Sequence, residues 1–152
     1  MRFRSLVLGA LAVLVAAVAA GCGGGGGGDR LTKDEYIAQA DAICKTANEE
    51  LDALAEPTSM EEIASLAGSA IAIQEDALAK LRELQPPEAD QATMDEALDL
   101  VDQQVEIGRQ VAEAAKAGDQ AKIEELIAQI DPLNTQADQI ATDYGLVECG
   151  KS

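Results

Sequence analysis

The chain has 152 residues, with 28 acidic residues against 11 basic ones and a formal net charge of −17. Such an acidic surface repels nucleic acid and anionic lipid headgroups, so neither is expected as a partner. The chain has no histidine or tryptophan. This absence excludes histidine-activated nucleophiles and His-containing zinc sites, and the near-absence of aromatic rings excludes aromatic platforms for bases or sugars.

Residues 1–21 have the layout of a secretory signal peptide. A basic start, Met1–Arg4, precedes an apolar run, Leu6–Ala20, that only Gly9 interrupts. The run is shorter than the roughly 20 apolar residues that a membrane-spanning helix needs. We therefore expect export of the chain and removal of this segment.

Ala20-Gly21-Cys22 closes the apolar run, and this sequence resembles the lipobox of bacterial lipoproteins, although Ala19 stands where that family usually has Leu. The resemblance implies cleavage after Gly21 and a diacylglyceryl group on the Cys22 thiol. Residues 22–30 would then be a lipidated cysteine followed by a flexible glycine-rich linker. The helical domain, residues 31–152, would be anchored at the extracytoplasmic face of the cell membrane.

Two amphipathic helices are predicted in the first half of the domain, because apolar residues recur there at alternating spacings of three and four. A capping box at 32–35 opens the first helix, which runs to about Ala55 before Pro57. A second capping box at 59–62 opens the next helix. Pro86-Pro87 ends it and forces a turn.

Two further helices follow with the same periodicity. The third begins between Glu88 and Asp95, with a possible capping box at 93–96, and it ends at Gly118-Asp119. The fourth contains Pro132, which either breaks the helix or kinks it. The apolar seam keeps its phase across the proline, so one kinked helix is preferred, with Gly145 as its C-terminal cap.

Four such helices with short links predict an all-α, antiparallel up-down-up-down bundle. Three helices with a detached fourth are the alternative. Gln74 lies among the apolar positions of the second helix. It is either a buried contact for a ligand or an ordinary residue that finds a hydrogen-bond partner within the fold or lies at the edge of the seam. The second interpretation is preferred.

Cys44 and Cys149 form an even pair once Cys22 is lipidated, which predicts a disulfide in an exported domain. In an up-down-up-down bundle, the start of helix one and the end of helix four lie at the same end. A tail turning back after Gly145 can span the roughly 16 Å that separates Cys44 from the start of its helix. We expect Leu146 or Val147 beneath this tail. A redox-active pair is the less favoured alternative.

Two groups of polar residues are weighed as sites. Four acids of the third helix repeat at spacings of four, three and four: Asp95, Asp99, Asp102 and Glu106. Such a row can bind hard cations, but it is more often a solvated face, so no metal site is predicted. Tyr36 and Tyr144 should meet at one end of the bundle, where they pack together or form a recognition patch.

The mature region also has a resemblance, carried by Ala40–Cys44, Pro86-Pro87, Ala117–Asp119 and Tyr144–Gly150. These segments are similar to uncharacterised secreted helical proteins of high-GC Gram-positive bacteria. The resemblance agrees with the predicted disulfide and implies no activity.

The leading functional hypothesis is a lipid-anchored module that binds a partner protein or takes part in an envelope assembly. The alternative is a sensor for a small ligand or a divalent cation, using the acidic row of helix three or a cavity between helices. A hydrolase with a carboxylate-only site is the least favoured, because no pair of acids stands out for acid–base work. We expect neither an enzyme nor a cofactor.

Overall fold

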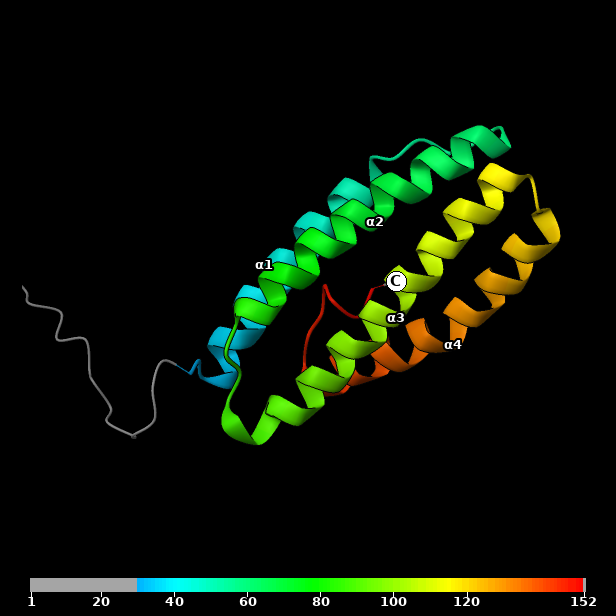
Figure 1. Ribbon diagram of the computed structural model, residues 1–152. Coiled ribbons are helices and arrows are strands. Elements are labelled where there is room, and N and C mark those ends of the chain that lie inside the picture. The colour runs from blue at the N-terminus through cyan, green and yellow to red at the C-terminus, as the bar shows by residue number, and fades with distance from the viewer. Residues whose placement is uncertain (1–29, 152) are drawn as a thin grey trace, which may run out of the picture.

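The computed structural model describes residues 30–151, which form four long helices and one short 3-10 turn (Figure 1). The elements in chain order are α1 Lys33–Asp52, α2 Met60–Glu83, η1 Glu88–Asp90, α3 Gln91–Ala117 and α4 Gln120–Tyr144. No strand occurs within these residues. The predicted all-α class and the helical bundle are therefore confirmed.

The capping box that opens α1 is present. The Thr32 hydroxyl accepts from the Glu35 N–H at 3.3 Å, and the Glu35 carboxylate accepts from the Thr32 N–H at 2.9 Å. Hydrogen bonds from the Thr32 hydroxyl and N–H also lower the pKa of Glu35. The helix ends at Asp52, before the predicted Ala55, because the chain tightens there: the Leu54 N–H bonds to the Leu51 carbonyl.

The starts of α2 and α3 depart from the predicted capping boxes. Ser59 caps α2 through the Glu62 N–H, but the Glu62 carboxylate bonds to Thr58 instead of completing the box. The box predicted at 93–96 is wrong, since Thr93 lies inside α3. The 3-10 turn η1 starts the helix earlier, and Asp90 at its N-cap makes no side-chain capping bond.

The C-terminal ends of α3 and α4 lie at the two glycines that the sequence predicts as helix ends. Gly118 and Gly145 both adopt left-handed backbone, with φ of 71° and 107°, which favours glycine at helix C-caps. Asp119 accepts from the Lys122 N–H at 3.0 Å and so caps α4. Pro132 lies inside α4, which continues through it as a single helix. The preferred reading of one helix is confirmed.

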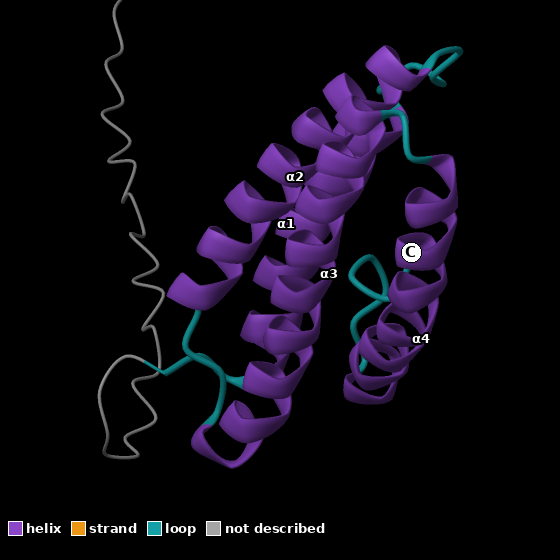
Figure 2. Cartoon of the chain, turned by 45° about the vertical axis from the view of Figure 1, so that its right-hand side comes forward, coloured by secondary structure: helices purple, strands orange, loops and turns teal. Residues whose placement is uncertain are grey.

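Consecutive helices pack against each other, but α1 and α4 do not make the corresponding helix-to-helix contact. The chain after α4, residues 145–151 (the tail), instead turns back into the bundle, and Figures 1 and 2 both show it there. This irregular segment covers part of the side between α1 and α4. Side chains of α1 and α4 meet only near one end.

The hydrophobic core has two clusters, one toward each end of the bundle. The first contains Tyr36, Ala40, Met94, Ala141, Tyr144 and Leu146, and the second contains Val111, Ala114, Ala115, Ile123 and Leu126. In the first cluster the two tyrosine rings pack edge to face with centroids 5.8 Å apart, so their predicted mutual packing is confirmed. The middle of α3 lies between the clusters.

The Tyr144 hydroxyl donates to the Asp90 carboxylate at 2.9 Å, which ties the end of α4 to the start of α3. Burial raises the pKa of Tyr144, and the bond to Asp90 raises it further. The phenol thus stays protonated and remains a donor.

A search of the described helices for a membrane-spanning segment, which must be both long and apolar, finds none.

Candidate functional site

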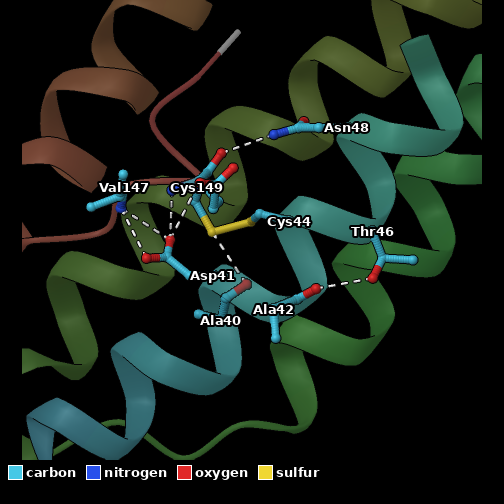
Figure 3. Close-up of a disulfide and its surroundings, with 9 residues drawn as sticks. Ala40, Asp41, Ala42, Cys44, Thr46, Asn48, Val147 and Cys149 are labelled. Carbon is cyan, nitrogen blue, oxygen red and sulfur yellow. Dashed lines mark hydrogen bonds between the residues drawn. A yellow bond between two sulfur atoms is a disulfide. The ribbon is translucent and has the colours of Figure 1, made fainter.

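The tail is covalently joined to α1. Cys44 and Cys149 form a disulfide across 105 residues of sequence, with Cα atoms 5.0 Å apart (Figure 3). The predicted bridge is confirmed. Leu146 is the tail residue that packs inside, at 7% exposed, whereas Val147 points outward at 62% exposed. Of the two alternatives for the residue beneath the tail, Leu146 is therefore the one observed.

Asp41 holds the tail backbone next to the disulfide. Its carboxylate accepts from the Val147 N–H at 3.0 Å, from the Glu148 N–H at 2.8 Å and from the Cys149 N–H at 3.3 Å (Figure 3). Asn48, on the same helix, donates to the Glu148 carbonyl at 3.0 Å. The irregular backbone of the tail thus obtains from α1 the hydrogen bonds that a helix would have made internally.

Beside the tail lies a cavity of about 330 Å³ (the central cavity), half open to solvent and lined by all four helices, the disulfide and Lys151. It occupies the level of Val101 and Gln104 on α3, between the two hydrophobic clusters. Because α1 and α4 do not pack together, the two clusters do not merge into one core, and this space is left between them. The absence of that helix contact creates the cavity.

The lining combines aliphatic side chains with amides. The apolar part consists of alanines and larger aliphatic residues: Ala47, Leu51, Ala77, Leu78, Leu81, Val101 and Ala137. The polar part consists of four amides and two charged groups: Asn48, Gln74, Gln104, Asn134, Asp138 and Lys151. No aromatic ring belongs to the lining.

Gln104 is the most unusual of these residues. It is only 9% exposed, and its side-chain amide makes no hydrogen bond to any residue in the 30–151 range. Every fully enclosed side-chain nitrogen or oxygen in that range has a partner. The unpaired amide of Gln104 must therefore keep contact with open space, and the space that it lines is the central cavity. Gln74 and Asn134, half-buried, also lack partners.

The sequence identified one of these three amides. Gln74 was singled out because it interrupts an apolar seam, and the structure places it at the cavity wall. Gln104 and Asn134 were missed, because they flank their seams and resemble ordinary surface residues. Since α3 packs against both α2 and α4, its buried face is wider than one seam and includes Gln104. In the sequence, Gln104 comes three residues after Val101, and this spacing indicates that both side chains lie on the same face of the helix.

The acids of the row on α3 are paired with neighbouring side chains. Arg82 bonds to both Asp99 and Asp102, and Arg109 bonds to Glu106 at 2.9 Å and to Glu75 of α2. Asp95 accepts from Gln91 at 2.8 Å. Within the described chain no three acidic, cysteine or histidine side chains gather as metal ligands would. These acids lie on a solvent-exposed face of α3 and form exposed ion pairs, which contribute little to stability.

Cys22, the predicted lipidation site, lies outside the described residues, as does the predicted signal segment 1–21. Searches against models of protein families, curated proteins and solved structures find no match to this chain. The case for a function therefore depends on the tail, the central cavity and the sequence before residue 30.

Proposed function

We propose that this chain is a lipid-anchored, extracytoplasmic binding protein whose helical domain takes a small ligand into the central cavity. The lipobox resemblance at Cys22 supports the anchor. The Cys44–Cys149 disulfide is compatible with an oxidising compartment outside the cytoplasm. The chain has no histidine, the commonest general acid or base, and we therefore propose binding and not catalysis.

The observation that carries the binding function is the unpaired amide of Gln104 in a cavity of about 330 Å³. Ligand sites in proteins have volumes of about 300–1,000 Å³ and combine apolar walls with a few polar groups. Since no fully enclosed polar atom of the described residues lacks a partner, the Gln104 amide is open to the cavity. A ligand that hydrogen-bonds to it would take the place of solvent there, and one such bond contributes about 0.5–1.5 kcal/mol net.

The partner-protein hypothesis has less support. Protein interfaces present contiguous apolar patches, whereas the large hydrophobic side chains found exposed in residues 30–151 are Ile127, at 48%, and Val147, at 62%. One lies on α4 and the other on the tail. We therefore place the small-ligand function first.

Replacing Gln104 with Leu is expected to stabilise the ligand-free chain by about 1 kcal/mol, because an aliphatic side chain needs no hydrogen-bond partner in the cavity wall. A structural residue would behave in the opposite way. The measurement is urea denaturation of the mature chain, residues 22–152, secreted with Cys22→Ser so that the disulfide forms without a lipid.

The matched control is Gln110→Leu, an exposed glutamine on the same helix, which should change stability by less than about 0.5 kcal/mol. A loss of more than about 1 kcal/mol in Gln104→Leu would show that the amide supports the fold. That result would contradict the proposal that Gln104 is kept for binding a ligand in the cavity.

The anchor has its own test. Cells that express the full chain and grow on radiolabelled palmitate should incorporate the label into the wild type and not into the Cys22→Ala variant, because the thiol is the predicted acceptor. A Cys44→Ser/Cys149→Ser variant, which keeps Cys22, should be labelled like the wild type. An unlabelled wild type would contradict the lipoprotein proposal.

A further inference from the structure

We infer that the ligand of the central cavity is an uncharged amphiphile, with a head group that both donates and accepts hydrogen bonds, on a short aliphatic body. Carboxamides and alcohols belong to this class. The inference rests on the proposed ligand-binding function and adds the chemistry of the ligand. It follows from the polar wall, the apolar wall, the charges and the size of the cavity.

The polar wall selects the head group. Gln104, Gln74 and Asn134 all line the cavity, and each side-chain amide has no hydrogen-bond partner within the described chain. Each amide offers two donor hydrogens and one acceptor oxygen. A head group that only accepts or only donates would leave part of this set unpaired. A carboxamide or a hydroxyl can satisfy both kinds of group.

The charged residues of the lining disfavour an ionised head. Lys151 is bonded to Glu148 at 2.7 Å, and Asp138 also has a partner in the structure. An anionic ligand would therefore have to compete with Glu148 for Lys151, and a cationic ligand with the present partner of Asp138, so neither would gain a full ion pair. An anion is disfavoured further by the net charge of −17 on the chain.

The apolar wall and the volume select the body. Leu51, Leu78, Leu81 and Val101 are aliphatic, and the lining has no aromatic ring on which a planar ligand could stack. A volume of about 330 Å³ equals roughly ten water molecules at about 30 Å³ each. The ligand body is thus a short alkyl or branched aliphatic group, not a long acyl chain.

Three probes with five carbon atoms each test the inference: pentanamide, pentanoate and pentylammonium. Each is titrated into the mature chain, residues 22–152 with Cys22→Ser, and the side-chain amide NMR signals of Gln104 and Gln74 are followed. Pentanamide should give saturable shifts of both signals. The two charged probes should bind at least about tenfold more weakly, because their heads lose hydration without gaining a full ion pair.

Gln104→Leu should weaken pentanamide binding about threefold to tenfold, the equivalent of one neutral hydrogen bond, while Gln110→Leu should leave it unchanged. A charged probe that shifts the cavity signals as strongly as pentanamide would overturn the ligand class and leave the cavity site standing. If none of the probes shifts the cavity amides, the ligand class and the ligand-binding function both fail.

Discussion

Removing the Cys44–Cys149 disulfide is expected to lower the free energy of unfolding by up to about 4–5 kcal/mol. The bridge closes a loop of 105 residues, and the chain-entropy model assigns about 4.7 kcal/mol to a loop of that length. Whole domains are stable by only about 5–15 kcal/mol. Because the core here is divided into two small clusters, this loss should remove much of the stability.

Urea denaturation of the mature chain, with and without a dithiol, measures the effect. The Cys44→Ser/Cys149→Ser variant should match the reduced wild type, and the dithiol should not change it. That insensitivity is the control for effects of the reductant itself. If the midpoint for the wild type barely moved on reduction, the tail would be held well enough by Leu146 and Asp41 alone, and the chain-entropy account would be wrong.

The helices could be predicted from the sequence because local signals fix them, and the bridge could be predicted once the order of the helices was known. The periodicity of apolar residues gave four helices, and Gly118 and Gly145 marked two helix ends through their left-handed backbone. The pairing of Cys44 with Cys149 followed from counting residues along a helix and an extended tail. The helix ends need only local signals, whereas the bridge also needs the antiparallel topology that brings the start of α1 and the end of α4 together.

The candidate site depended on a longer-range fact, which the sequence does not contain. An up-down-up-down bundle implies contact between α1 and α4, but the tail occupies that side and the helices stay apart. The central cavity follows from this separation. No local pattern says whether Gln104 faces water or a cavity, because that depends on how widely α3 is covered by its two neighbours.

The structural role of Asp41 likewise could not be predicted from the sequence. The sequence offers 28 acidic residues, and only the folded tail shows that this one accepts hydrogen bonds from three backbone N–H groups. Its position three residues before Cys44 places both side chains on one face of α1. Once the disulfide is predicted, an acid at that spacing becomes a candidate partner for the returning backbone.

Asp41→Ala is expected to destabilise the chain by about 2–3 kcal/mol, because it removes a charged acceptor and leaves the N–H groups of Val147, Glu148 and Cys149 without their partner. Urea denaturation of the mature chain measures the loss. The control is Asp131→Ala, an exposed acid on α4 whose side chain makes no hydrogen bond in the described structure, and it should change stability by less than about 0.5 kcal/mol.

The loss should depend on the disulfide, because both contacts hold the same segment to α1. In the Cys44→Ser/Cys149→Ser background, Asp41 is then the main restraint on the tail, and Asp41→Ala should release the tail locally before the helices unfold. Hydrogen exchange at the Glu148 amide would detect this release as faster exchange with unchanged protection in α3. If the two changes were strictly additive and the Glu148 amide stayed protected, the tail would be held by the packing of Leu146 and not by Asp41.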